Sequence, residues 1–176
     1  NDYANENDTL EMELYAGSPL TGTYTVGSAP SDFSTLQEAV DSLNAPSGIG
    51  GPVIFEIKPG TYSSQYTLGE IHGSSPDYTV TIRSQSGDPA DVTITTDSTD
   101  YLLKLDGTDH IRFEDLTFRS DHAEQLVVIT NGSNHNAFNG NRFEGTEQTR
   151  DLILSPQETG SVDSMNLFTG NYLTGS

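Results

Sequence analysis

The chain has 176 residues, a length that suits one domain, and 32% of them are hydrophobic, so any core is small. Its 26 acidic residues outnumber the seven lysines and arginines, and the net charge of −19 argues against nucleic acid or an anionic membrane as a partner. Because the chain has no cysteine, its fold depends on neither disulfide bonds nor thiolate metal ligands.

Residues 1–20 differ in character from the rest of the chain. Leu10, Met12 and Leu14 alternate with acidic residues, which is the period of a half-buried strand. One such strand is not stable alone, so we expect the last strand of a preceding β-sandwich, or a linker. The chain starts with neither Met nor a leader sequence, and we expect it to be a segment of a longer protein.

Residues 21–51 are predicted to form an N-terminal strand at Thr23–Val26 and a capping helix. Ser34 and Gln37 have the spacing of a capping box, and Pro46 marks where the helix has ended. One face of the helix is apolar, because four residues recur at helical spacing: Leu36, Ala39, Val40 and Leu43.

Residues 52–176 form a series of short β-rich segments separated by Gly-, Asn- and Asp-containing turns, which indicates an all-β architecture. The predicted strands are Val53–Ile57, Tyr66–Leu68, Tyr78–Ser84, Val92–Thr96, Tyr101–Leu105, Ile111–Phe118, Leu126–Thr130, Ala137–Phe143, Leu152–Leu154 and Met165–Leu173.

An internal repeat distinguishes between the all-β folds. Phe113, Phe138 and Phe168 match at intervals of 25 and 30 residues, and a second matching set is Phe118, Phe143 and Leu173. A repeat of this length is typical of a β-solenoid, in which like residues stack in columns, whereas a β-sandwich, the alternative, needs no such repeat. The same alignment predicts a short amide ladder of Asn141 and Asn171.

Four segments in this order carry a family resemblance: Gly22–Gly27, Asp32–Val40, Gly51–Ile57 and Lys58–Tyr62. They resemble the first coils of pectin-lyase-like right-handed β-helices, including pectin methylesterases. They are more similar still to β-helical modules of large secreted surface and adhesin proteins of Bacteroidota-type bacteria. The resemblance implies an all-β fold, a right-handed parallel β-helix of about four to five coils with one short N-terminal capping α-helix.

The resemblance also implies a domain order. In such proteins the module often follows an immunoglobulin-like domain, which residues 7–14 would end. The expected organisation is therefore residues 1–20 from a preceding domain or linker, residues 21–51 as strand and cap, and residues 52–176 as coils that are C-terminally incomplete.

The sequence supports no catalytic assignment. The resemblance implies esterase chemistry on Gln-Asp-Thr-Leu and Asp-Phe-Ile-Phe-Gly segments, and the nearest segment here, Glu144–Gln148, matches neither. The residues that a polysaccharide lyase would use are close in sequence, but their strand positions predict a solvent-facing surface rather than a site: Asp109, Arg112, Asp115 and Arg119.

Two histidines and three acidic turns are the candidate metal-binding residues of the sequence. His110 and His135 occupy equivalent repeat positions, with Ser164 as the third, and are expected to lie within about 5 Å of each other. They are either a two-histidine metal site or two exposed strand-edge residues. We predict no cofactor beyond weak structural Ca²⁺ in three acidic turns: residues 87–88, 97–100 and 106–107.

The expected function is a non-catalytic structural or adhesive module of a large secreted protein of the cell surface or an appendage. Its partners would be a surface glycan or other subunits, with a homo-oligomer through exposed coil ends as a further possibility. No run of residues has the length of a membrane span. The alternative is the N-terminal part of a carbohydrate-active enzyme, lyase or methylesterase-like, with catalytic coils beyond residue 176.

Overall fold

The computed structural model describes residues 17–156 and 160–175, so the strand predicted at Leu10–Leu14 lies outside the described residues. The elements in chain order are β1 (Leu20–Val26), α1 (Leu36–Leu43), β2 (Ile49–Ile57), β3 (Gly60–Ser63), β4 (Tyr66–Leu68), β5 (Val80–Ser84), a 3₁₀ helix η1 (Pro89–Asp91), β6 (Val92–Thr95), β7 (Tyr101–Asp106), β8 (Ile111–Glu114), β9 (Thr117–Arg119), β10 (Gln125–Thr130), β11 (Ala137–Asn139), β12 (Arg142–Glu144), β13 (Asp151–Leu154), β14 (Leu167–Thr169) and β15 (Tyr172–Thr174).

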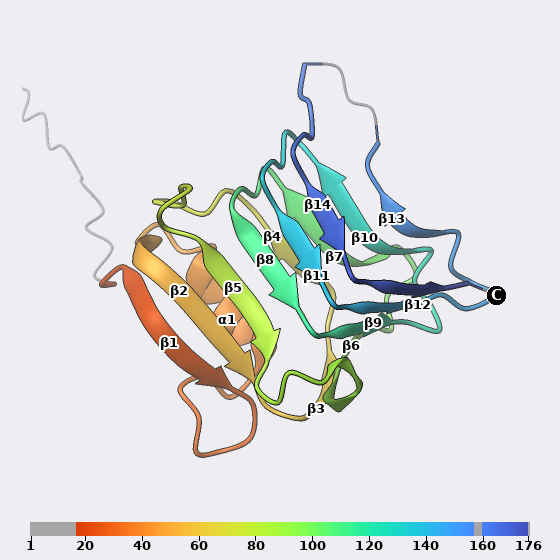
Figure 1. Ribbon diagram of the computed structural model, residues 1–176, viewed down its shortest axis with the longest axis horizontal. Coiled ribbons are helices and arrows are strands. Elements are labelled where there is room, and N and C mark those ends of the chain that lie inside the picture. Colours follow the sequence, from red (N-terminus) through yellow and green to blue (C-terminus); the bar gives the residue numbers. More distant parts are fainter. Residues whose placement is uncertain (1–16, 157–159, 176) are drawn as a thin grey trace, which may run out of the picture.

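The strands form three parallel sheets that wind around one core (Figure 1). The first sheet has the order β1-β2-β5-β8-β11-β14, the second β3-β6-β9-β12-β15 and the third β4-β7-β10-β13. The chain visits the sheets in turn, from first to second to third, and then returns to the first beside the strand that it laid down before. The result is a right-handed parallel β-helix of four coils with a fifth begun, which confirms the predicted fold.

Alternation within each strand creates the core. In β5 the side chains of Val80 and Ile82 are buried while Thr81 and Arg83 are partly exposed, because successive residues of a strand face opposite sides. Since each coil lies in register on the one before, the inward residues of all coils form one continuous apolar cluster. Burial of this cluster is the main force that holds the coils together.

The aromatic column predicted from the repeat is confirmed. Phe113 pairs in register with Phe138, and Phe138 with Phe168. Ring centroids in both pairs are 4.9 Å apart, with interplanar angles of 13° and 1°. Phe118 and Phe143 stack in the same way at 5.2 Å. Because the column crosses three coils, it couples the stability of neighbouring coils.

Three predicted long strands were wrong in their length. Ile111–Phe118 is divided into β8 and β9, and the two later copies are divided in the same way. The break lies at Asp115, which has a φ of 54°, and at the equivalent Gly140 and Gly170, with φ of 66° and 63°. A residue in this left-handed conformation turns the chain sharply, so that the second half of each segment joins a different sheet. The strand β3 was not predicted at all.

The predicted amide ladder lies immediately after these bends. The side chain of Asn141, which is fully buried, accepts a hydrogen bond from the Leu116 N–H at 3.0 Å and donates one to the Phe113 carbonyl at 2.8 Å. One coil further on, Asn171 makes the same two bonds to Asn141 and Phe138. Each asparagine therefore satisfies backbone groups of the preceding coil that the bend leaves without strand partners.

A second amide ladder, which we did not predict, runs along the bends between the third and first sheets. Asn136 accepts from the Ile111 N–H at 3.1 Å and donates to the Thr108 carbonyl at 2.7 Å. Asn166 repeats this pattern on Asn136 and Ser133. The coils are thus tied together by side-chain amides at two corners as well as by the sheets.

The helix caps the N-terminal end, as predicted, and packs against β1, β2 and β4 (Figure 1). The four apolar residues predicted for its inner face are all buried. The predicted capping box was wrong by one residue, because Thr35 rather than Ser34 is the N-cap and accepts from the Glu38 N–H at 3.2 Å. Glu38 in return accepts from the Ser34 N–H at 2.8 Å. Within the described ranges, no helix is long and apolar enough to cross a membrane.

Substitution at the N-cap tests this correction. Thr35→Ala is expected to lower the free energy of unfolding by about 1 kcal/mol, the usual cost of losing a capping hydroxyl. Ser34→Ala keeps the backbone bond to Glu38 and is expected to change stability by much less. Urea denaturation of the two variants measures the difference, and equal losses would contradict the assignment of Thr35 as the cap.

The last coil differs from the others in exposure. Apolar side chains on β14 and β15 are partly open to solvent, because no further described strand lies beside them. They are Leu167, Phe168, Tyr172 and Leu173, with exposed fractions from 37% to 57%.

Candidate functional site

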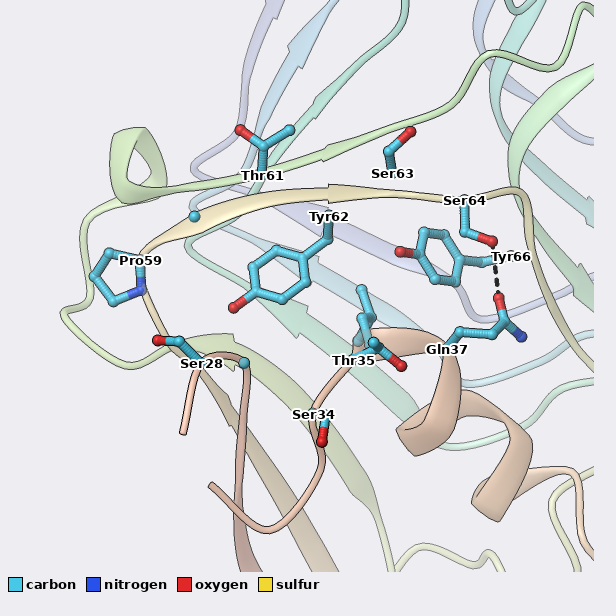
Figure 2. Close-up of a pocket in the computed structure, with 13 residues that line it drawn as sticks. Ser28, Ser34, Thr35, Gln37, Pro59, Thr61, Tyr62, Ser63, Ser64 and Tyr66 are labelled. Carbon is cyan, nitrogen blue, oxygen red and sulfur yellow. Dashed lines mark hydrogen bonds between the residues drawn. The ribbon is translucent and has the colours of Figure 1, made fainter. Parts of the chain in front are cut away.

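A cleft of about 420 Å³ lies between β3 and the first turn of α1 (Figure 2). None of its lining residues is charged, although the whole chain carries a net charge of −19. The cleft is rich in hydroxyl groups and contains two tyrosines. It is lined by Gly27, Ser28, Ser34, Thr35, Leu36, Gln37, Pro59, Gly60, Thr61, Tyr62, Ser63, Ser64 and Tyr66.

The floor of the cleft depends on a close approach of two chain segments. The hydroxyl of Tyr62 donates to the Lys58 carbonyl at 2.8 Å and lies 3.3 Å from the Val26 carbonyl. Gly27, with a φ of 127°, makes room for this hydroxyl, because a Cβ at that position would collide with it. The ring of Tyr62 is thereby fixed below β3, with one side toward the first turn of α1 (Figure 2).

The far end of the cleft is closed by a contact between the helix and the end of β3. The Ser64 hydroxyl donates to the side-chain oxygen of Gln37 at 3.0 Å (Figure 2), and the Gln37 amide nitrogen donates to Asp41 at 2.8 Å. Both polar ends of Gln37 are therefore used, and its orientation is fixed.

Tyr66 is the residue of the cleft with an unused polar group. Its side chain is only 3% exposed, and the ring also packs against Leu36 and Val40 of the core. Its hydroxyl points into the cleft, where no described residue forms a hydrogen bond with it (Figure 2). Burial, with a smaller contribution from Tyr62, raises the pKa of Tyr66 above its ordinary value, so the phenol stays protonated and can donate.

A second hollow, of about 360 Å³, lies on the outer face of the third sheet. Most of the charged groups in its lining are paired, Lys104 with Asp106 at 2.9 Å and Arg150 with Glu124 at 3.2 Å, and Asp100 also lines it. The side-chain oxygen of Gln125 also accepts a hydrogen bond from Arg150. Since these groups satisfy one another, the hollow has less capacity for a ligand than the cleft at Tyr66.

The residues considered for lyase chemistry do not converge. Arg112 is exposed on the outer side of β8, in the first sheet, whereas Arg119 belongs to β9 in the second sheet and pairs with Asp121 at 3.3 Å. Asp109 accepts from the Asn134 N–H, and Asp115 occupies the bend between β8 and β9. No group of these side chains surrounds a common point.

The segment nearest to an esterase motif, Glu144–Gln148, begins with the last residue of β12 and continues into the loop after it, where Glu147 and Gln148 are exposed. The hydroxyl of Thr146 bonds to the turn itself, at the Gln148 N–H. These interactions account for the segment as a turn.

The predicted stacking of His110 and His135 is confirmed. Their ring centroids are 4.9 Å apart, and the ring planes are inclined by 21°. The third position of the column was wrong, because the register of β11 and β14 places Met165, not Ser164, above His135. Ser164 instead bonds to Asn134.

Two of the three acidic turns considered for Ca²⁺, residues 87–88 and 106–107, have local partners for their carboxylates. Asp88 caps η1 by accepting from the Ala90 N–H at 2.9 Å, and Asp106 bonds to Lys104 and Asn131. Among the residues that the structure describes, no group of three or more His, Asp or Glu side chains is arranged to hold a metal ion.

Sequence reasoning missed the cleft itself. Tyr66 begins a predicted strand, so its burial was expected, but nothing in its strand pattern indicates that the hydroxyl faces an open space. Tyr62 belongs to the Lys-Pro-Gly-x-Tyr segment, which indicated the fold rather than a site. The cleft forms only when the helix folds against the first coil.

Comparisons with known proteins identify the fold. No protein-family model matches the chain, and no curated protein matches its sequence. Among solved structures, it is similar to a pectin methylesterase from Aspergillus niger in deglycosylated form, with a TM-score of 0.59 and 17% sequence identity. The similarity covers 90% of this chain and 58% of the methylesterase chain. The likeness agrees with a pectin-lyase-like β-helix.

Proposed function

We propose that the chain is a non-catalytic β-helical module of a secreted surface protein and that it binds an uncharged glycan in the cleft at Tyr66. The observation that carries the proposal is the Tyr66 hydroxyl, which is nearly inaccessible except from the cleft and has no partner among the described residues. The hydroxyl is open to the cleft, since no buried side-chain polar atom among the described residues lacks a partner, and it can donate a hydrogen bond there to water or to a ligand.

The chemistry of the lining favours a neutral saccharide. Hydroxyls of Ser, Thr and Tyr both donate and accept, as do the hydroxyls of a sugar ring. The rings of Tyr62 and Tyr66 supply apolar surface for the C–H faces of that ring. Because the lining has no cationic side chain, it offers nothing to neutralise a uronate or sulfate group, and the net charge of the chain opposes such ligands.

The same lining supports a binding role rather than catalysis. Glycoside hydrolysis uses two facing carboxylates, and acyl transfer uses an activated nucleophile with a base. The lining residues include neither carboxylate nor imidazole groups. The proposal is therefore recognition of a glycan without conversion of it.

The secreted setting is part of the proposal. It is supported by the strongly acidic composition and by the resemblance to modules of secreted surface proteins. Immunogold labelling of intact source cells tests it: label on the outer surface is the expected result, and label confined to the cell interior would contradict it.

A second candidate function is the N-terminal part of a carbohydrate-active enzyme. The observation in its favour is the similarity to a pectin methylesterase, of which this chain spans 58%. Release of methanol from methylated pectin by the protein isolated from its source would support this candidate. Binding of glycans without any release of methanol or unsaturated product would favour the adhesive module.

Tyr66→Phe tests the binding site directly. The substitution removes one hydroxyl and keeps the ring that packs in the core, so we expect about a tenfold loss of affinity, the effect of one hydrogen bond of ~1.4 kcal/mol. Binding is measured by titration calorimetry with the neutral oligosaccharides that bind best on a glycan array that also carries oligogalacturonate.

The matched control is Tyr101→Phe, which removes a phenol bonded to Thr67 at 2.9 Å outside the cleft. This variant is expected to bind as the parent does. The proposal fails if no neutral glycan on the array binds at millimolar concentration, or if Tyr66→Phe and the parent bind equally.

A further inference from the structure

We infer that His110, His135 and Met165 form a surface site for a soft monovalent metal ion, Cu(I) or its redox-inert counterpart Ag(I). The site is independent of the proposed glycan cleft and shares no residue with it. Its basis is a column of three potential ligands on successive coils.

The register of the first sheet places the three residues in one column. Arg112 pairs with Ala137, and Ala137 with Leu167, so the residues two positions earlier in each coil are aligned as well. Adjacent coils are about 4.8 Å apart, and the two imidazole centroids are 4.9 Å apart. Met165 continues the column on the next coil, and its side chain is 74% exposed.

The three residues also share an unusual backbone conformation. Their φ angles are 59°, 57° and 56°, in the left-handed region that a residue such as methionine adopts rarely. The conformation is held by hydrogen bonds between coils: the His110 N–H donates to the Asn134 carbonyl, and the His135 N–H to the Ser164 carbonyl. Because the backbone is fixed in the same way three times, the side chains leave it in the same direction.

The imidazole nitrogens are free to bind an ion. No described residue forms a hydrogen bond with a ring nitrogen of His110 or His135, although Asp109 and Asn134 lie in the same turns and are bonded to each other. The neutral imidazole is the form that binds metals.

The geometry suits an ion with few ligands. With metal–imidazole bonds of ~2.0 Å, two nitrogens on opposite sides of one ion are about 4 Å apart. In the stack the ring planes are nearly parallel, so the nitrogen lone pairs, which lie in those planes, do not converge. Binding therefore requires each imidazole to turn about its Cβ–Cγ bond until one of its nitrogens faces the ion. The thioether of Met165 then supplies a third, soft ligand from the next coil.

The ligand set selects the class of metal. Imidazole together with thioether favours Cu(I) over hard cations, which prefer oxygen ligands. Asp109, the carboxylate nearest in sequence, is occupied by the Asn134 N–H. The net charge of −19 attracts cations of any kind to the surface, so the selectivity must come from these three side chains.

Metal titration of the full chain tests the inference. Calorimetry with Ag(I), and competition for Cu(I) against bicinchoninate under anaerobic conditions, are expected to give one site per chain. In ¹H–¹⁵N spectra of the histidine side chains, His110 and His135 are expected to shift, while His72 and His122 stay unchanged. Zn²⁺ is expected to bind at least tenfold more weakly, since it prefers four ligands.

Substitutions identify the ligands. His110→Asn and His135→Asn, which suit the left-handed backbone, and Met165→Leu are each expected to weaken Ag(I) binding at least tenfold. The matched controls are His122→Asn and Met12→Leu, the latter at the other methionine of the chain. Absence of a one-to-one site would overturn the inference. So would undiminished binding by His135→Asn, or undiminished binding by Met165→Leu.

Discussion

Replacing Phe138 with alanine is expected to lower the free energy of unfolding by about 3–5 kcal/mol, the cost of removing a large aromatic side chain from a packed core. Phe138 is fully buried and stacks between Phe113 and Phe168, with centroids 4.9 Å away on both sides. It also lies 6.0 Å from Phe143 in the second sheet. The cavity would therefore border three coils at once. The side chains of these coils are closely packed and have little freedom to move into it.

Urea denaturation followed by circular dichroism measures this loss. The matched control is Phe168→Ala, one position along the same column, where the side chain is 37% exposed. This variant is expected to lose less than half as much stability, because part of the ring is already in water. Equal losses of stability in Phe138→Ala and Phe168→Ala would contradict the conclusion that burial determines how much each ring of the column contributes.

Asn141→Leu is expected to lower the free energy of unfolding by about 2–4 kcal/mol. The substitution keeps the size of the side chain but leaves two buried backbone groups, the Leu116 N–H and the Phe113 carbonyl, without their partners. Each buried group without a partner costs about 1–3 kcal/mol. The effect is therefore electrostatic rather than steric.

The control for this prediction lies two residues earlier in the same coil. Asn139 is on the outer side of β11, where its amide bonds to Glu114 and Thr169 in contact with solvent. Asn139→Leu is expected to cost less than 1 kcal/mol, because water replaces both partners. A loss for Asn141→Leu no greater than that for Asn139→Leu would contradict the role assigned to the buried ladder.

The sequence was sufficient to predict the columns of stacked residues. Phe113, Phe138 and Phe168 recur at the same position of a repeat, and parallel in-register pairing is the arrangement in which such a repeat stacks all three in one column. The same reasoning located the Asn141 ladder and the buried face of the capping helix. These features depend on periodicity, which a single sequence displays.

The bends were not predicted, although periodicity carries a trace of them. Ile111 and Phe113 are two residues apart, whereas Leu116 and Phe118 lie at odd spacing from them, so the alternation changes phase at Asp115, which adopts the left-handed conformation without being glycine. Aspartate tolerates this conformation better than most residues but does not require it. The glycines at the equivalent positions of later coils carried the stronger signal. The predicted N-cap was wrong by one residue for a similar reason, since Ser34 and Thr35 are both suitable caps.

The cleft at Tyr66 could not be predicted from the sequence, because it belongs to no single repeat. Its walls come from the first turn of α1 and from β3, and their separation is set by the contact between Gln37 and Ser64. Whether the Tyr66 hydroxyl faces protein or open space depends on that distance. The histidine pair was predictable as a stack, but the identity of its third neighbour depended on the register of β14.

The coils stay in register with one another although the length of the repeat changes. The ladder bonds join residues 25 positions apart between β8 and β11, and 30 positions apart between β11 and β14. The five additional residues are accommodated outside the columns: one before β13, where the offset is 26, and four in the connection from the third sheet back to the first. Peptides inserted into this connection after Leu154 would project from one side of the β-helix, at a defined position along its axis. Such a scaffold can acquire new recognition loops during evolution, or by design, without a new core.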